Sequence, residues 1–166
     1  MQALSDRRPS PLAKLYIDAS RQYRRKHGKS YWQAIQEQEQ DSERYLFNDE
    51  IFWHAHAVPI GEREVRGILP VAGIEEAGSY IDQLARDLLS VISFYRKLGT
   101  YSFNMSIFFE KKRNNRNYSA FCSFISRINP NPNSTSDSAF MERLHLEPVI
   151  LTLPEDLGPY YRGNRL

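Results

Sequence analysis

The chain has 166 residues, of which 41% are hydrophobic and 13% aromatic, so it has enough apolar material for one folded domain with a core. Its 22 basic and 20 acidic residues leave a formal net charge of only +2, which gives no electrostatic case for a nucleic-acid-binding protein. The single cysteine, Cys122, excludes an internal disulfide and a cysteine-based zinc site, and it fits a reducing, cytoplasmic compartment.

The start of the chain does not have the pattern of a signal peptide. Residues 1–11 are polar and contain no apolar run, so we expect a flexible N-terminus and no signal peptide. The longest apolar stretches are too short to span a bilayer, so we expect no membrane association. The predicted domain covers residues 12–162, followed by a short tail at 163–166.

The first half of the chain predicts two helices followed by three short strands. Ser10-Pro11 is a typical helix start, and His27-Gly28 is a typical helix end. Ser30 is a suitable cap for the second helix, which ends in a run of Gln and Glu residues. The expected elements are helices at 11–26 and 30–40 and strands at 44–47, 51–58 and 64–69.

The second half is dominated by one long amphipathic segment. Between residues 74 and 98, apolar side chains from Ala77 to Tyr95 recur at helical spacing until Gly99 ends the pattern. The expected elements after it are a strand at 101–110, a loop at 111–117, a strand at 118–128, a loop at 129–137, a helical turn at 138–144, a strand at 149–153 and a helix from Pro154. This order predicts an α+β fold, an antiparallel sheet with one long packed helix and flanking helices.

Several local patterns occur in an order that is typical of one protein family. They are IFWHAHAVP (51–59), a strand ending in LP (69–70), YSFNMSIFFEK (101–111), SAFCSFISRINP (119–130) and FMERLHLEPVILTLPEDL (140–157). Together they resemble the histidine-triad superfamily, and more closely the C-terminal half of galactose-1-phosphate uridylyltransferases, over about residues 12–162. The resemblance implies a histidine-triad-like fold.

The resemblance also implies a chemistry that this chain does not complete. In that family a uridylyl group is transferred in two displacement steps through a uridylyl-histidine intermediate. The nucleophilic histidine lies in a His-Pro-His motif of the other half, and no His-Pro occurs in this sequence. We therefore expect a partner half-domain or a homodimer, and the sequence leaves open whether the other half is on another chain, belongs to a longer protein or does not exist.

The departures from the family pattern concern the histidines of this half. Phe108 stands where the family commonly has a histidine after the Met of the 101–110 strand, and the family's His-x-His pair falls on Ser123 and Ile125. Alternation along a strand puts Ser123, Ile125 and Arg127 on one face, which would be the face of the ancestral cleft. These side chains do not form a metal site, so we expect no catalytic residue, no metal and no cofactor here.

The candidate ligand is a nucleotide sugar or a sugar phosphate. A hydroxyl-rich loop, residues 134–138, is suited to present backbone N–H groups to a phosphate, and nearby arginines would add charge-assisted hydrogen bonds. A buried asparagine in an aromatic strand would need partners or face a pocket. The candidate substrate-binding residues are Asn104, Arg127, Glu142, Arg143 and His145, and for each the alternative is an ordinary surface or structural role.

Two other functions remain open. The first is an interaction or scaffold domain in which Phe108, Phe109 and Phe124 fill the former ligand cleft. The second is a metal-dependent enzyme, because His54 and His56 share one strand face and would need a third ligand such as Glu50 or His145.

Basic residues cluster twice in the sequence, at 21–29 and at 111–116. We interpret the first cluster as a solvated helix end and the second as a solvated loop.

Overall fold

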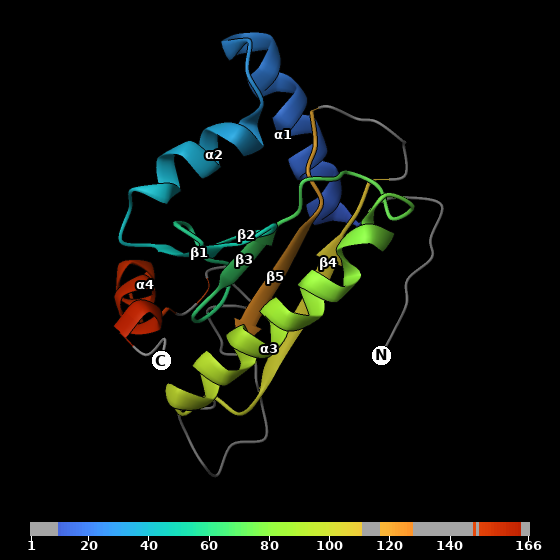
Figure 1. The fold of residues 1–166 in the computed structure, drawn as a ribbon. Helices are drawn as coiled ribbons and strands as arrows, with labels where there is room; N and C mark the ends of the chain where they lie inside the picture. Colours follow the sequence, from blue (N-terminus) through green and yellow to red (C-terminus); the bar gives the residue numbers. More distant parts are fainter. Residues whose placement is uncertain (1–9, 111–116, 128–147, 149, 164–166) are drawn as a thin grey trace.

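The computed structural model describes residues 10–110, 117–127, 148 and 150–163. Within these ranges, one antiparallel sheet of five strands in the order β1-β2-β3-β5-β4 lies between helices on both faces (Figure 1). The predicted α+β fold with an antiparallel sheet is therefore confirmed. The strands are β1 (Tyr45–Asn48), β2 (Phe52–Ala55), β3 (Val65–Ile68), β4 (Phe103–Phe108) and β5 (Phe121–Ser126).

Two helices from the start of the chain cover one face of the sheet, α1 (Pro11–His27) and α2 (Tyr31–Gln40). The predicted ends of α1 are confirmed, because the Ser10 hydroxyl accepts a hydrogen bond from the Ala13 N–H at 3.2 Å and Gly28 adopts a left-handed φ of 75°. Aromatic rings join this layer to the sheet, and the Trp32 ring stacks on Phe121 with 5.3 Å between centroids.

The opposite face is covered by α3 (Ile81–Lys97), which follows a 3-10 turn, η1 (Ala77–Tyr80), and by α4 (Pro154–Gly163). The ring of Phe94 on α3 meets the ring of Tyr161 on α4 edge to face at 5.3 Å. Buried residues of this larger core include Leu46, Ile51, Trp53, Val65, Val91, Tyr95, Cys122, Phe124 and Leu157.

The long helix differs from its prediction at the start and on its buried face. The α-helix begins at Ile81 rather than at residue 74, and the Ile81 side chain is 60% exposed. Polar Asp87 is buried instead, because its carboxylate accepts a hydrogen bond from the indole N–H of Trp53 at 2.8 Å. A buried indole donor needs such a partner, and this requirement turns a polar position of the helix toward the core.

The prediction of a strand at 149–153 is wrong for residues 150–153, which the structure describes and which have no strand partner there. Their backbone groups are bound by a side chain instead. The buried carboxylate of Glu62 accepts the Leu151 N–H at 2.6 Å, the Thr152 N–H at 3.2 Å and the Thr152 hydroxyl at 2.5 Å. A carboxylate with several acceptor sites thus replaces a strand ladder. The predicted helical turn at 138–144 and loop at 129–137 lie outside the described residues.

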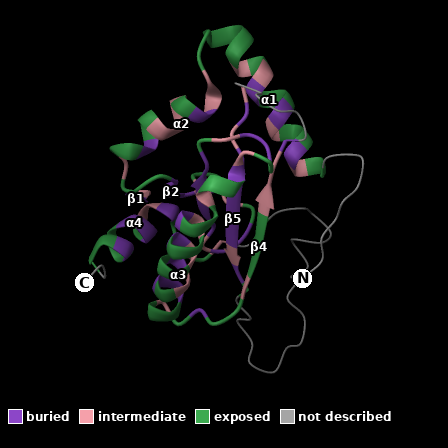
Figure 2. Cartoon of the chain, turned by 45° about the vertical axis from the view of Figure 1, so that its right-hand side comes forward, coloured by how far each residue is buried: buried purple, intermediate pink, exposed green. Residues whose placement is uncertain are grey.

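One edge of the sheet is much more exposed than its neighbour. The inner strand β5 is almost entirely buried, whereas the edge strand β4 exposes three consecutive residues, Asn104, Met105 and Ser106 (Figure 2). None of the helices in the described ranges has the combination of length and apolarity that crossing a membrane requires.

Gly67 provides a test of the packing around the buried ring of Trp53 on the neighbouring strand. A Cβ atom at this position of β3 would lie 2.7 Å from ring atoms of the buried Trp53. We expect Gly67→Ala to destabilise the fold by about 1–3 kcal/mol, because the indole has no room to move. Urea denaturation gives the free energy of unfolding.

Gly78→Ala is the matched control, because a Cβ there meets open space. It should leave the stability unchanged or raise it slightly. Equal stability of the two variants would contradict the tight contact between Gly67 and Trp53.

Candidate functional site

Two of the five predicted substrate-binding residues lie in the described part of the chain, and they are neighbours. Asn104 on β4 pairs with Ile125 on β5, and the backbone N–H of Arg127, one residue beyond β5, donates to the Ser102 carbonyl at 2.8 Å. Both side chains are exposed. The argument from a buried asparagine therefore does not apply, and both residues lie at the end of the β4–β5 pair where β4 begins and β5 ends. Glu142, Arg143 and His145 lie outside the described residues.

Ser123 and Ile125 stand where the family that the sequence resembles has its histidine pair, and both side chains contact other parts of this chain. The Ser123 hydroxyl is buried and donates to Oε1 of Glu64 at 2.8 Å. Ile125 is half-buried, and its side chain lies directly against Gly61, where a Cβ would overlap it. This part of the sheet face is thus filled by the segment between β2 and β3.

The three phenylalanines of the scaffold hypothesis do not fill one cleft. Phe108 stacks on Phe121 at 4.8 Å on the face covered by α1 and α2. Phe124 is fully buried on the other face, where its ring lies 4.9 Å from that of Phe103. Phe109 is half-buried against the same core as Phe124.

A buried polar cluster lies between α1 and the sheet, and we call it the Glu64–Arg66 cluster. Its centre is an ion pair of 2.6 Å between Nε of Arg66 and Oε1 of Glu64, whose side chains are only 3% and 0% exposed. The other carboxylate oxygen accepts the Ile60 N–H at 2.7 Å. Nη1 of Arg66 donates to the Tyr16 hydroxyl, which lies 3.4 Å from Nε2 of His56.

Aromatic faces complete the surroundings of the buried guanidinium. Its central carbon lies 4.9 Å from the ring centroid of Tyr16 and 5.2 Å from that of Phe121, both within cation–π range. Nη2 of Arg66 is buried without a hydrogen-bond partner among the described residues. Sequence reasoning missed this cluster. The signal was the pair of opposite charges at positions 64 and 66, which share one face of a predicted strand.

The two histidines of the metal hypothesis lie beside this cluster. His54 pairs with Arg66 across β2 and β3, and its Nδ1 lies 2.9 Å from the Ala55 carbonyl oxygen. Burial lowers the pKa of His54 to about 4, although the negative charge of Glu39 acts in the opposite direction. Burial together with the positive charge of Arg66 lowers the pKa of His56 to about 2. Both imidazoles are therefore neutral at pH 7.

Neutral imidazoles are the form that binds metals, but the neighbouring guanidinium opposes a second cation. Within the described residues there is no group of three His, Cys, Asp or Glu side chains that could hold a metal ion. Glu50, one proposed third ligand, is exposed, and His145 lies outside the described ranges.

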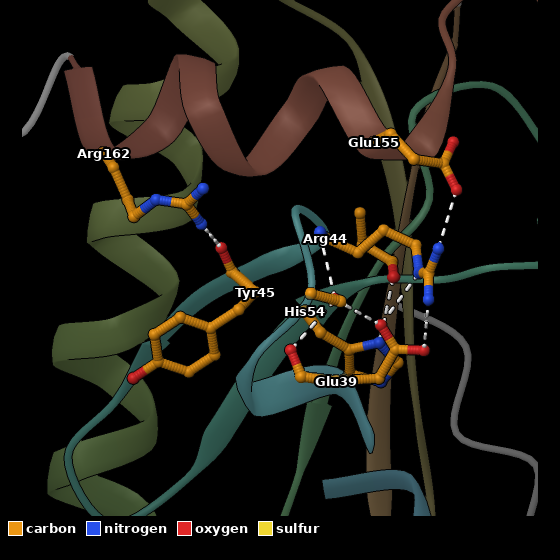
Figure 3. A network of polar contacts seen from close by, with 8 residues as sticks. Glu39, Arg44, Tyr45, His54, Glu155 and Arg162 are labelled. Atoms are coloured by element: carbon orange, nitrogen blue, oxygen red, sulfur yellow. Dashed lines mark hydrogen bonds and ion pairs between the residues drawn. The ribbon is translucent and has the colours of Figure 1, made fainter. Parts of the chain in front are cut away.

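A second polar network near His54 joins three elements. Figure 3 shows the carboxylate of Glu39 on α2 facing the guanidinium of Arg44, with Nε to Oε2 at 2.8 Å. Nη1 of Arg44 reaches Oε1 of Glu155 on α4 at 2.7 Å. The network ties the two helices to the start of β1, so its role is structural.

The lowered pKa values of His54 and His56 predict a stability that depends on pH. Because the pKa values of both histidines in the folded protein lie below the ordinary value of 6.5, their contribution to the free energy of unfolding is complete above pH 6.5. It is lost as the pH falls toward 4 for His54 and toward 2 for His56, by about 1.4 kcal/mol per pH unit for each histidine. Urea denaturation at pH 7 and pH 5 should show this loss.

His56→Gln should reduce the difference between the two pH values, whereas His27→Gln, which changes an exposed side chain on α1, should not. The same pH dependence in all three proteins would show that the buried histidines are not its source.

The Glu64–Arg66 ion pair predicts a strong coupling between two substitutions. Arg66→Met should cost about 3–5 kcal/mol of stability, because it leaves the Glu64 carboxylate charged and buried. The double variant Glu64→Gln/Arg66→Met should be more stable than Arg66→Met alone, since no unpaired charge remains. Thermal or urea unfolding measures both.

Lys14→Met removes an exposed ion pair with Asp18 and should change stability little. If the double variant is no more stable than Arg66→Met alone, the ion pair does not act as a unit.

Comparison with known proteins gives a fold and no family. No family model and no curated protein matches the sequence. A solved structure of uridylyltransferase is similar, with a TM-score of 0.74 and 16% identity over 92% of this chain and 50% of that chain. A mutant uridylyltransferase structure gives a TM-score of 0.73, again at 16% identity, over 92% of this chain and 52% of that chain. The chain thus spans about half the length of these solved structures, and it has the fold of one domain of a uridylyltransferase.

Proposed function

We propose that this chain is one half of a uridylyltransferase-like assembly that binds a nucleotide sugar or a sugar phosphate. In this proposal the chain supplies contacts to the substrate, and a partner half supplies the nucleophile. The observation that carries the proposal is the adjacency of Asn104 and Arg127, both with exposed side chains, at the end of the β4–β5 pair where β4 begins.

The exposed side chains at this end of the strand pair suit a phosphorylated sugar. The amide of Asn104 both donates and accepts hydrogen bonds, and Ser102 and Ser106 add hydroxyl groups on exposed positions. The guanidinium of Arg127 has the fork geometry that binds a phosphate through two parallel hydrogen bonds. Hydroxyl-bearing and phosphate-bearing parts of one ligand would therefore each find a matching group.

The described residues around this end provide no nucleophile for nucleotidyl transfer. Ser123 donates its hydroxyl to a carboxylate, and Cys122 is buried with a pKa raised by burial to about 12. His54 lies on β2 opposite Arg66, and His56 directly follows that strand, where its N–H donates to the Glu64 carbonyl. A complete reaction would therefore need a group from elsewhere, which is consistent with a chain half as long as the similar solved structures.

The exposed edge of the sheet is a suitable place for a partner half. β4 is the outermost strand on its side, so one row of its backbone donors and acceptors has no strand partner in the described residues. Met105 is 43% exposed on this strand, and Tyr101 just before it is 81% exposed. An edge strand with exposed apolar side chains favours pairing with another chain, either a partner half or a second copy.

Calorimetric titration of the purified chain with a UDP-hexose and with a hexose 1-phosphate tests this proposal. We expect binding of at least one of them, and Arg127→Ala should weaken it about tenfold by removing charge-assisted hydrogen bonds to phosphate. Asn104→Ala should weaken binding less. Arg96→Ala, which removes an exposed arginine from α3, is the matched control and should bind like the unaltered chain.

Sedimentation measurements then decide between the two kinds of partner. A dimer that Met105→Lys dissociates would favour a second copy at β4, and a monomer would favour a separate half. Binding that is unchanged in Arg127→Ala, or no binding by the chain in any state of assembly, would overturn the proposed contacts and favour the interaction-domain hypothesis.

A further inference from the structure

The outer side of α3 carries a stripe of exposed apolar residues. Ile81 and Leu89 are 60% and 68% exposed, and Ala85 between them is also exposed. These three residues are spaced four apart, so they lie along one side of the helix, and we call them the α3 stripe. Figure 1 shows α3 in front of the sheet, with no described helix or strand over its outer side.

The stripe faces outward because polar residues occupy the buried side of α3. The Trp53 indole N–H donates to one carboxylate oxygen of Asp87 at 2.8 Å, and the Gln83 amide donates to the other at 2.7 Å. Both Gln83 and Asp87 are buried, so their contacts fix the rotation of the helix about its axis. Each residue of the stripe is two positions from one of them, about 200° around the helix, and therefore points away from the core.

Two charges of opposite sign lie at equal distances from Leu89. Asp82 is seven residues before it and Arg96 seven residues after it, and both are exposed. Seven residues are nearly two turns, about 10.5 Å along the axis, so both charges lie on the same side of α3 as Leu89. Within the described residues neither side chain has an ion pair or a hydrogen bond, and the guanidinium of Arg86 is bound to Gln83 at 2.7 Å.

We propose that the α3 stripe is a contact between two copies of this chain, with the two α3 helices antiparallel and Leu89 at the two-fold axis. In a two-fold contact, residue i of one copy meets residue j of the other, and j meets i. With Leu89 at the axis, Asp82 of one copy lies opposite Arg96 of the partner subunit, so the dimer gains two ion pairs. The equal spacing about Leu89 favours a second copy over an unrelated partner, which would need no such symmetry.

The two charges also have an ordinary role within a single helix. Acidic residues near the start of a helix and basic residues near its end compensate the helix dipole, and Asp82 lies in the first turn of α3 and Arg96 in the last. Exchanging both charges would oppose the dipole at both ends of the helix. In the proposed dimer the same exchange restores two ion pairs, so the double exchange separates the two explanations.

This contact does not rest on the proposed substrate contacts. Asn104 pairs with Ile125, which shares a strand face with Ser123, and that face is the one that α1 covers. Helix α3 covers the opposite face of the sheet. Loss of the α3 contact should therefore leave binding of a sugar phosphate unchanged, and the α3 contact should survive Met105→Lys at the edge strand.

Sedimentation equilibrium of the full chain tests the contact. One helix from each copy makes a small interface, so we expect a reversible dimer within about 5–500 µM protein. Leu89→Lys should raise the dissociation constant at least about tenfold, because it places two ammonium groups side by side at the axis. Leu15→Lys is the matched control, since it makes the same change at a 63% exposed position of α1, which also has 17 residues. It should leave the equilibrium unchanged.

The charge exchange is the sharper test. Asp82→Arg and Arg96→Asp should each raise the dissociation constant about tenfold, because each places like charges opposite one another twice. Asp82→Arg/Arg96→Asp should return it to within about threefold of the unaltered chain.

Four results would each overturn the proposal: a monomer at every concentration up to about 500 µM, a dimer that Met105→Lys but not Leu89→Lys dissociates, an equal loss in Leu15→Lys, or a double exchange that associates no better than the single ones. Thermal unfolding of each variant shows whether it is folded.

Discussion

On the face of the sheet that α1 covers, the carboxylate of Glu64 and the guanidinium of Arg66 meet at 2.6 Å and are almost completely removed from water. Charges buried this deeply are stable only when paired and hydrogen-bonded, so the groups around them are constrained. Tyr16 must lie over the guanidinium, the Ile60 N–H must reach the carboxylate, and Ser123 must donate to it. One ion pair thereby fixes α1, the segment between β2 and β3, and the middle of β5 relative to one another.

The same pair decides which chemistry this face of the sheet supports. Its guanidinium lowers the pKa of the neighbouring His56 beyond the effect of burial, and it opposes the binding of a metal cation by His54 and His56. Ser123 is used as a donor to the carboxylate. The centre of the sheet is therefore a buried structural region, and the proposed ligand contacts, Asn104 and Arg127, lie on exposed positions at its border.

The border where β4 begins has a different chemical character from the buried centre. It presents the amide of Asn104, the hydroxyls of Ser102 and Ser106 and the guanidinium of Arg127 on exposed positions, and the proposed contacts to a sugar phosphate rest on this combination. β4 is also an edge strand, with no strand partner on its outer side among the described residues. The basic run at 21–29, interpreted from the sequence as a solvated helix end, includes Arg21, whose guanidinium lies 3.3 Å from the buried carboxylate of Glu110.

Local sequence was sufficient to predict the features that depend on neighbouring residues. The helix cap at Ser10, the stop at Gly28 and the order of strands and helices follow from local backbone preferences, which act within a few residues. Tertiary structure alone decided the buried polar contacts, because their partners are far apart in the chain: 34 residues for Trp53 and Asp87, and 90 for Glu62 and Thr152. The exposure of Asn104 was equally beyond local reasoning, since alternation along a strand does not reveal whether that strand lies at the edge of a sheet or inside it.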